Sequence, residues 1–460
     1  MRSNNIKGIF TFCGGVHPPQ SKHLTCEKTI EQGPVGKQIA IMLSQHIGAA
    51  CEPLVKKADA VQLGQKVGDA AAFVSAPVHS SVSGKVKEIS LQSHSVLGRS
   101  MAVVIETDPA GNPPKPPPFA KFTDNFDDGA YSAEQIREAV RQAGIVGMGG
   151  AGFPTRVKLE PNPKTPKKLI IINGCECEPY ITCDYRVMLE WTNQLIAGIK
   201  LTAKAAECSN VVIGIEDNKP QAIEAINKAL KNSVNADNIR VVTVKTKYPQ
   251  GGERQLIKAI LKKSVPTGGI PPMIGVLVLN VATTAAIAEA VVCSAPLTHR
   301  VVTVTGEAVA RPGNYYVPIG ISVGELVEFC GGVTQKSAKV VLGGPMMGIA
   351  VADLSTPITK TTNAVTVLTK EQIGREKFEK QQTPCIRCGR CLDACPEHLN
   401  PTKIAHAVKN NCISVAESYY ITACIECGCC SYVCPAKIEL TGHIKAGKIF
   451  LARQKKKMPE

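Results

Sequence analysis

The sequence predicts a multidomain protein that combines α/β and α+β units with a small N-terminal β domain and a C-terminal helical module. Three observations support this fold class. The chain has 460 residues, enough for several domains. A proline-rich stretch, "DPAGNPPKPPPFAKF", separates short strand-like segments from a region where helical and strand-like patterns alternate. Finally, the chain has 19 cysteines, and they cluster near its C-terminal end.

Composition narrows the classes of function. Aromatic residues make up 4% of the chain, and no base-reading motif accompanies the net charge of +15, so we expect no nucleic-acid partner. We expect the charge to serve docking on acidic proteins or lipid headgroups. The opening "MRSNNIKGIFTFCGG" has no apolar signal-peptide core, so the cysteines indicate metal binding in a reducing compartment. The apolar run from Met273 is interpreted as a strand, "GVLVLN", and a helix, "TTAAIAEAVV", not as a membrane span.

Residues 1–112 are predicted to form the small β domain. Short strands with Gly-Asp and Ser-Gly turns in "ADAVQLGQKVGDAAAFVSAPVHSSVSGKVKEIS" are typical of a β sandwich. The segment resembles a lipoyl-type barrel-sandwich hybrid, but its hairpin tip, "APVHSSVSG", lacks the usual lysine. We therefore predict a scaffold without lipoyl or biotin attachment, and structural roles for His17 and His79. Residues 113–130 follow as a proline-rich linker.

Residues 131–296 are predicted to form an α/β domain with a phosphate-binding loop. "GIVGMGGAGFPTRVK", from Gly144, contains G-x-G-x-x-G, but the stretch before it is helical, with Ser132 and Gln135 spaced as a capping box. A Rossmann site requires a strand there, whereas the strand "KKLIIING" comes only afterwards. The loop is therefore predicted to hold phosphate in a non-Rossmann setting, with Lys158 adding charge.

Further candidates follow the strands of this domain. "NGCECEPYITCDYR" ends a strand in a turn with three cysteines and three carboxylates: Cys175, Cys177, Cys183, Glu176, Glu178 and Asp184. A third metal site is conceivable there, but the spacing favours free cysteines beside a pocket. "KYPQGGERQL" leads into a helix near Glu253, and "LNVATT" ends another strand. Three strand ends and one glycine loop are thus candidates for binding a single phosphate-bearing ligand. Each feature taken alone would be interpreted as structural, and their shared order favours the ligand.

Residues 297–366 are predicted to form a third domain. "HRVVTVTGEAVARPGNYYVPIGISVGELVEFCGGV" has the pattern strand, turn, strand, helix. It resembles a soluble-ligand-binding β-grasp domain, and "LGGPMMG" is its glycine-rich exit.

Residues 367–460 carry an internal duplication of C-x2-C-x2-C-x3-C-P, with the second run 39 positions after the first. In this pattern three thiolates of one run hold one cluster, and the fourth, before a proline, ligates the other. We expect one [4Fe–4S] cluster on Cys385, Cys388, Cys391 and Cys434, and a second on Cys424, Cys427, Cys430 and Cys395. Zinc is disfavoured because it does not use the third C-x2 step. Cys429 falls outside the register. The segment is thus predicted to be a helical, ferredoxin-like two-cluster module.

The four motifs of residues 131–296, in this order, resemble the flavin-binding subunit of respiratory complex I. Together with "GGVHPP" near the N-terminus and the two cysteine runs, the whole chain resembles the C-subunit family of the Rnf electron-transport complexes. The resemblance implies non-covalent FMN with NAD(H) stacked on it. It implies FMN contacts at Gly147, Gly149, Gly150, Gly152, Lys158, Asn173, Asn280 and Thr283. It also implies catalytic positions near the flavin or the nicotinamide for Glu178 and Glu253. Complex I has acidic residues where this chain has Cys175 and Gly252.

A flavin between NAD(H) and the clusters is chemically required, because nicotinamide exchanges hydride whereas a cluster takes one electron at a time. The resemblance implies the NAD(H)-oxidising or NAD(H)-reducing subunit of a Na⁺- or H⁺-translocating ferredoxin:NAD oxidoreductase. Such a subunit is peripheral, on the cytoplasmic face of the bacterial inner membrane, and attached through other subunits. One alternative is a flavin-dependent cobalamin reductase, in which the barrel-sandwich segment follows the cluster module. Another is a non-catalytic polyferredoxin conduit, which flavin content would distinguish.

Overall fold

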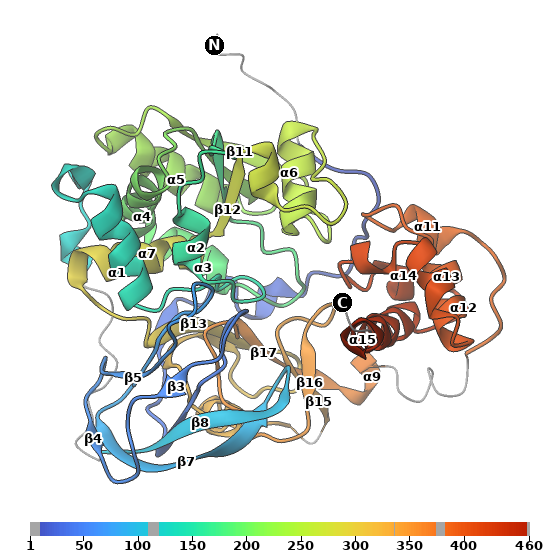
Figure 1. The fold of residues 1–460 in the computed structure, drawn as a ribbon, viewed down its shortest axis with the longest axis horizontal. Coiled ribbons are helices and arrows are strands. Elements are labelled where there is room, and N and C mark those ends of the chain that lie inside the picture. Colours follow the sequence, from blue (N-terminus) through green and yellow to red (C-terminus); the bar gives the residue numbers. More distant parts are fainter. Residues whose placement is uncertain (1–9, 109–118, 335, 374–381, 458–460) are drawn as a thin grey trace.

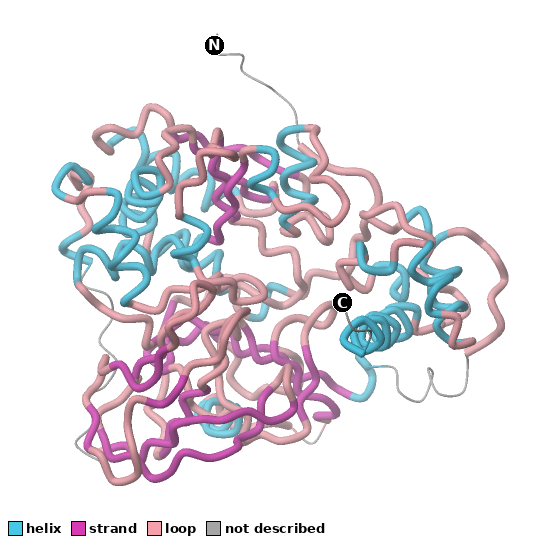
Figure 2. Tube along the Cα trace, viewed as in Figure 1, coloured by secondary structure: helices cyan, strands magenta, loops and turns pink. Residues whose placement is uncertain are grey.

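The computed structural model describes residues 10–108, 119–334, 336–373 and 382–457. Figure 1 shows an α/β body (teal to yellow-green), a β-rich body below it that mixes blue and orange segments, and a red helical module at one side. Strands concentrate in the β-rich body, and helices in the other two (Figure 2). Residues 113–118 of the predicted linker lie outside the described residues, and the domain boundaries stay predictions.

The α/β body is built on a parallel sheet with the strand order β11-β10-β9-β12. Its strands are β9 (Leu169–Asn173), β10 (Val211–Glu216), β11 (Ile239–Val244) and β12 (Val276–Asn280). Each is a short run rich in Val, Ile and Leu, which suits a sheet covered on both faces. Ile170 and Ile172 pack into one core and Ile171 into another, so both faces are indeed buried.

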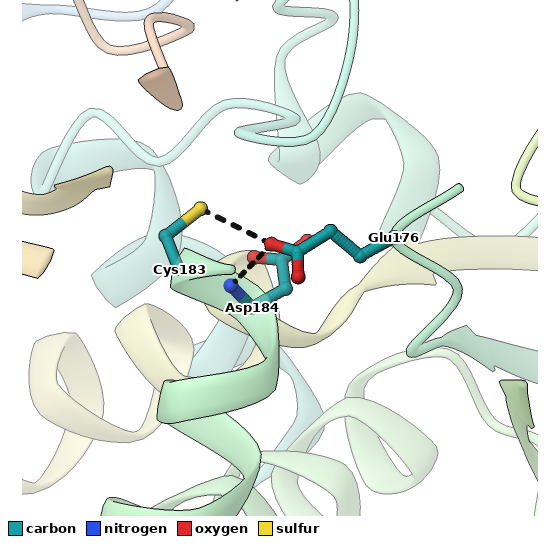
Figure 3. A group of neighbouring side chains, drawn as sticks. All are labelled: Glu176, Cys183 and Asp184. Carbon is teal, nitrogen blue, oxygen red and sulfur yellow. Dashed lines mark hydrogen bonds between the residues drawn. The ribbon is translucent and has the colours of Figure 1, made fainter. Parts of the chain in front are cut away.

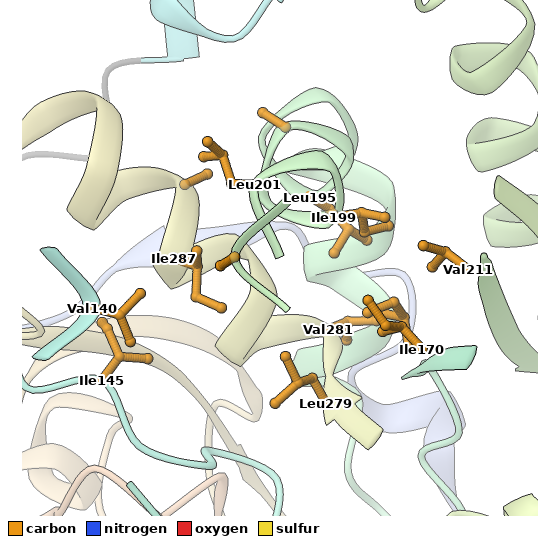
Figure 4. Packing of buried hydrophobic residues seen from close by; sticks show 14 of the residues in the cluster. Val140, Ile145, Ile170, Leu195, Ile199, Leu201, Val211, Leu279, Val281 and Ile287 are labelled. Carbon is orange, nitrogen blue, oxygen red and sulfur yellow. The ribbon is translucent and has the colours of Figure 1, made fainter. Parts of the chain in front are cut away.

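Helices cover the two faces of this sheet. They are α1 (Ala133–Gln142), α2 (Thr155–Leu159), α3 (Cys183–Glu190), α4 (Thr192–Ala205), α5 (Pro220–Asn232), α6 (Glu253–Leu261) and α7 (Val281–Cys293). Side chains of α1, α4 and α7 pack with β9, β10 and β12 in the core of Figure 4. Leu256 and Ile257 of α6 pack on the opposite face. The predicted capping box of α1 is confirmed, with reciprocal bonds between Ser132 and Gln135.

The sheet has a switch point between β9 and β12. Strands β10 and β11 extend from β9 to one side, whereas the connection through α6 returns β12 to the other side. Open α/β sheets bind ligands in the crevice outside the carboxyl ends of such strands. The apolar run after Met273 forms β12 and α7, as predicted. Among the described residues, no helix combines the length and apolarity that a bilayer crossing requires.

The β-rich body contains three sheets. One has the order β2-β8-β7-β4 and another the order β3-β5-β6. Their strands are β2 (Gln38–Met42), β3 (Glu52–Pro53), β4 (Ala60–Val61), β5 (Lys66–Asp69), β6 (Val78–His79), β7 (Gly84–His94) and β8 (Gly98–Thr107). The third has the order β1-β14-β13-β17-β15-β16. It comprises β1 (Ile30–Gln32), β13 (His299–Thr305), β14 (Gly313–Pro318), β15 (Ser337–Leu342), β16 (Ile349–Val351) and β17 (Ala364–Thr369), with α8 (Val323–Phe329) and α9 (Lys370–Ile373).

The predicted N-terminal and β-grasp domains are not separate hydrophobic units. Ile39, Ile41 and Ile105 of the first share one buried core with Val302 and Val367 of the second. Strand β1 also pairs in parallel with β14 of the β-grasp sheet. The sequence predicts two bodies because the two segments are far apart along the chain, and apolar periodicity does not reveal which faces meet.

The hairpin tip "APVHSSVSG" is buried at the junction of the bodies. Lys360 Nζ donates to Pro77 O (2.6 Å) and to Gly144 O (2.8 Å), joining the tip to the α/β body. Ser81 Oγ donates to Ile319 O (2.6 Å). His79 is buried, and burial together with Lys360 lowers the pKa of His79 to about 3. The tip is therefore a structural contact between bodies.

The helical module contains α11 (Arg390–Asp393), α12 (Pro401–Lys409), α13 (Ile413–Ser418), α14 (Cys429–Tyr432) and α15 (Leu440–Lys457). Helices α12, α13 and α15 enclose a small core that includes Ile404, Ile413 and Ile444. Across the described residues, short 3-10 helices are formed by Lys22–Leu24, Phe119–Lys121, Asp128–Ala130, Pro271–Ile274 and Ile421–Ala423.

Candidate functional site

The carboxyl ends of β9 and β12 carry the predicted asparagines, and we call the region between these strand ends and the glycine loop the crevice. Asn173 and Asn280 are register partners on these neighbouring strands. Asn280 caps α7, because its Oδ1 accepts from the N–H groups of Ala282 (2.9 Å) and Thr283 (3.3 Å). Its Nδ2 donates to Asp184 Oδ2 (2.6 Å). A single side chain thus fixes the helix start and the acidic turn after β9.

The glycine loop lies over the start of α7. The N–H of Met148 donates to Thr283 Oγ1 (2.9 Å), and that of Gly147 to Phe153 O (2.9 Å). A Cβ added at Gly149 would lie 2.6 Å from Asn280 Nδ2, so only glycine fits there. At Gly150 an added Cβ would meet nothing within 4 Å, and this residue is exposed. The loop therefore packs on Asn280 and presents open backbone at its tip.

The far end of the loop is held by the β-rich body. Gly152 has a φ of +73°, and an added Cβ there would lie 2.8 Å from Thr361. Its carbonyl accepts from Ile47 N (3.3 Å). Arg300 Nη1, from β13, donates to Met148 O (3.3 Å). The loop is thus anchored from two bodies, which the local sequence does not reveal.

Lys158, Glu253 and Asn173 belong to the same region. Lys158 Nζ donates to Glu253 Oε1 (3.1 Å) and to Val278 O (3.2 Å). Asn173 Nδ2 donates to Gly251 O (2.9 Å), which ties the glycine turn after β11 to the end of β9. The three strand ends thus lie together, and their shared phosphate-bearing ligand stays a prediction. The charge of Lys158 is paired with Glu253 here, an arrangement that their distance in sequence does not indicate.

Glu178 turns toward the β-grasp sheet. Its two oxygens accept from the N–H groups of Met346 (3.1 Å) and Met347 (2.7 Å), in the loop "LGGPMMG". A Cβ at Gly344 would lie 2.2 Å from Glu178 Oε2. Burial raises the pKa of Glu178 to about 7, against the opposing effect of both N–H donors. The sequence predicts this loop as the glycine-rich exit of its domain, and in the structure two of its N–H groups also bind the carboxylate of Glu178.

The three cysteines of the turn after β9 do not form a common metal site. Cys175 Sγ donates to Gly214 O (3.6 Å), Cys177 Sγ accepts from Gly251 N (3.3 Å), and Cys183 lies beside Glu176. The three thiols therefore have different neighbours.

Glu176, Cys183 and Asp184 form a buried group of their own (Figure 3). Glu176 Oε1 accepts from Asp184 N (2.8 Å) and from the Cys183 thiol (3.5 Å), so it caps the first turn of α3. Glu176 Oε2 is buried without a hydrogen-bond partner among the described residues. Burial, and next the charge of Glu176, raise the pKa of Asp184 to about 7. The Asp184 carboxyl group is therefore protonated below neutral pH.

The fourth cysteine of the first run lies with the first three of the second. A partly open cavity is lined by Cys395, Cys424, Cys427 and Cys430. We call these residues the second cluster site. The remaining predicted ligands, which we call the first cluster site, are Cys385, Cys388, Cys391 and Cys434. Three cysteines of the second cluster site are buried, whereas Cys385 and Cys388 are exposed.

The duplication extends to hydrogen bonds on sulfur. Cys385 and Cys424 accept from the N–H two residues later, at 3.4 and 3.3 Å. Cys395 and Cys434 accept from the N–H four residues later, at 3.3 and 3.4 Å. Threonine hydroxyls 39 positions apart contact two further sulfurs, Thr402 at Cys391 (3.0 Å) and Thr441 at Cys430 (3.5 Å). Applying the 39-residue register beyond the cysteines would have identified both threonines.

The N-terminal segment was also missed as part of the site. Lys22 Nζ donates to the carbonyls of Glu176 (2.8 Å), Glu178 (3.0 Å) and Ile181 (2.5 Å) and so secures the acidic turn. An open pocket lies between this segment and the carboxyl ends of β10 and β11. Its lining includes His17, Gln20, Lys22, Asn218 and Thr246.

Comparison with known families assigns three segments. Residues 140–289 match the family described as the Nuo51 FMN-binding domain. Residues 10–110 match the RnfC barrel sandwich hybrid domain, and residues 301–350 match the SLBB domain. The barrel-sandwich, complex-I-type and β-grasp predictions are thereby confirmed.

Curated relatives cover most of the chain. The C subunit of the proton-translocating ferredoxin:NAD(+) oxidoreductase complex of Clostridium ljungdahlii is 42% identical over 410 residues, 89% of this chain and 87% of the relative. The C subunit of the Na(+)-translocating complex of Acetobacterium woodii is 42% identical over 450 residues, covering 97% and 98%. The C subunit of the ion-translocating oxidoreductase complex of Rhodobacter capsulatus is 39% identical over 398 residues, covering 86% and 74%.

Among solved structures, the air-oxidised NAD+-reducing [NiFe]-hydrogenase superposes with a TM-score of 0.50 at 21% identity. The match covers 67% of this chain and 57% of the hydrogenase chain. At that identity the likeness concerns the fold.

Proposed function

This chain belongs to the C-subunit family of the ion-translocating ferredoxin:NAD(+) oxidoreductase (Rnf) complexes, and from this premise we propose that it exchanges electrons between NAD(H), FMN and two [4Fe–4S] clusters. One observation carries the proposal. The crevice and the second cluster site lie in one chain, and Tyr248, which packs on Cys427 of that site, directly precedes the glycine turn bonded to Asn173.

The residues of the crevice fit a flavin nucleotide. The tip of the glycine loop offers open backbone at Gly150, and the crevice lies at the switch point of the sheet. When bound, FMN exchanges hydride with NAD(H) and single electrons with iron–sulfur clusters. Asn173 and Asn280 supply amides at the strand ends, and Lys158 supplies a cation that Glu253 holds in place. These residues bind and orient the nucleotide.

The cysteines fit two clusters of the ferredoxin type. The second cluster site already has four thiols around one cavity, drawn from both runs as the spacing predicts. Backbone N–H groups donate to four of the eight sulfurs. Both threonines add hydroxyl contacts. The helical module is thus a two-cluster electron carrier fused to a flavin domain.

The chain works within a larger assembly in this proposal. Its attachment to the cytoplasmic face of the membrane runs through partner proteins of the complex, and the net charge of +15 supports docking on acidic surfaces. The order of domains argues against the cobalamin-reductase alternative, since the barrel-sandwich match at residues 10–110 precedes the cysteine runs. The FMN-binding match argues against a conduit without flavin.

An anaerobic NADH titration of the protein reconstituted with FMN, iron and sulfide tests this function. We expect NADH to bleach the flavin absorbance, followed by EPR signals of reduced clusters. A protein with intact clusters that binds no added FMN and does not respond to NADH would contradict the assignment.

A further inference from the structure

A single buried contact joins the flavin crevice to the second cluster site. Its buried members come from the N-terminal segment, the α/β body and both cysteine runs: Val16, Tyr248, Ala394, Cys427 and Cys429. Cys177 and Met346 pack against them. Tyr248 is only 1% exposed and directly precedes the glycine turn bonded to Asn173 and Cys177. Tyr248 therefore lies between the glycine turn that is bonded to Asn173 and the second cluster site.

The hydroxyl of Tyr248 reaches the cluster loop. It donates to Cys427 O (2.8 Å), the backbone carbonyl of a predicted cluster ligand. The backbone of Tyr248 is fixed at the same time, because its N–H and carbonyl exchange hydrogen bonds with Val16 (2.9 and 2.8 Å). The bond is thus a defined link from a rigid backbone to the cluster loop.

Other contacts at this interface involve the second cluster site. Gly15 N donates to Ala394 O (2.9 Å), and a Cβ at Gly14 would lie 2.8 Å from Cys395 O. Gln255 Nε2, from α6, donates to Glu397 Oε1 (2.6 Å). In contrast, the loop of the first cluster site is exposed at Cys385 and Cys388, and Ile386 between them is 65% exposed. The two sites therefore have different neighbours.

We propose that Tyr248 is a positioning residue for electron exchange, because its hydroxyl holds the Cys424–Cys430 loop against the flavin crevice. The second cluster site is then the electron partner of the flavin, and the exposed first cluster site exchanges electrons with the outside. Two electrons per NADH cross this contact one at a time, and no bond of Tyr248 breaks. This inference rests on the proposed function and adds the order of the two sites.

Tyr248→Phe removes only the hydroxyl, and Tyr315→Phe is a matched control. Tyr315 is also 1% exposed, and its hydroxyl donates to the backbone carbonyl of Arg311 (3.0 Å), far along the chain from the clusters. Stopped-flow absorbance would separate flavin bleaching by NADH from the later cluster reduction. EPR-monitored redox titration would give the midpoint potential of each cluster. Iron content would confirm that both variants are loaded.

We expect Tyr248→Phe to bleach its flavin at the wild-type rate but to reduce its clusters about fivefold more slowly, as the loss of one buried hydrogen bond implies. The midpoint potential of the second cluster should fall, because hydrogen bonds near the ligands stabilise the reduced cluster. The first cluster and Tyr315→Phe should match wild type.

Wild-type kinetics and wild-type potentials for both clusters in Tyr248→Phe would overturn the inference, as would equal changes in Tyr315→Phe. If NADH fails to bleach even the wild-type flavin, the proposed function fails instead. In that case a titration with a chemical reductant still decides whether Tyr248 acts on the second cluster.

Discussion

Replacing Asp184 with asparagine removes one of two carboxyl groups that the fold buries side by side, so we expect it to stabilise the α/β body above neutral pH. Asp184 is 6% exposed and Glu176 is 5% exposed. The amide oxygen of an asparagine can still accept the hydrogen bond from Asn280 Nδ2. The substitution therefore removes the charge and preserves the contact.

The magnitude follows from the pKa of Asp184, which the fold raises from 3.8 to about 7. A carboxyl group whose pKa is raised by folding keeps its proton in the folded chain at pH values where the unfolded chain has already lost it. The contribution of protonated Asp184 to the free energy of unfolding is therefore fully present below about pH 4, and it is lost as the pH rises to 7. Between pH 5 and 7 the loss corresponds to two pH units at 1.36 kcal/mol each, or about 3 kcal/mol. The asparagine variant should avoid that loss.

The single tryptophan of the chain, Trp191, provides the assay. It lies at the end of α3, the helix that Glu176 caps, so its fluorescence reports unfolding of this region. Urea unfolding gives the free energy of unfolding at pH 5 and at pH 8. The difference between Asp184→Asn and wild type should increase by about 3 kcal/mol in favour of the variant from the lower to the higher pH. Asp237→Asn, at an exposed position, should show no such gain. A variant whose advantage is equal at both pH values, or smaller at pH 8, would refute the reasoning.

Three further substitutions probe other parts of the structure. Gly149→Ala should weaken FMN binding at least tenfold in a fluorescence-quenching titration, because the new methyl group meets Asn280; Gly442→Ala in α15 of the helical module, where the new methyl group makes only ordinary contacts, should bind like wild type. Cys395→Ser should lose about half of the iron and the EPR signal of the second cluster, although it lies in the first motif; loss of the first signal alone would refute cross-ligation. Lys360→Met should cost roughly 2–4 kcal/mol in urea unfolding, because two buried carbonyls lose their donor; a change below about 0.5 kcal/mol would contradict this.

Local signals predicted the elements well. The capping box of Ser132 and the strand and helix after Met273 are confirmed, because each depends on residues within one turn or one strand. The grouping of Cys395 with the second run could also be predicted, since cluster chemistry fixes the ligand spacing.

Contacts between distant segments were not predictable. The carboxylate of Glu178 accepts from Met346 and Met347, and the hydroxyl of Tyr248 donates to Cys427, more than 160 positions away in each case. Neither contact produces a periodic or compositional pattern in the sequence. The same holds for the core that the barrel-sandwich segment shares with the β-grasp sheet.

That shared core has a consequence for biosynthesis. Ile105 completes its strand early, yet its packing partner Val367 is translated about 260 residues later, roughly 13–50 s at 5–20 residues per second. During that interval the nascent N-terminal sheet exposes an apolar face to the surrounding solvent. The ribosome must synthesise nearly the entire α/β body before the β-grasp sheet can cover this face. Premature termination anywhere between these two positions should therefore release an aggregation-prone fragment, one that chaperones or proteases must remove.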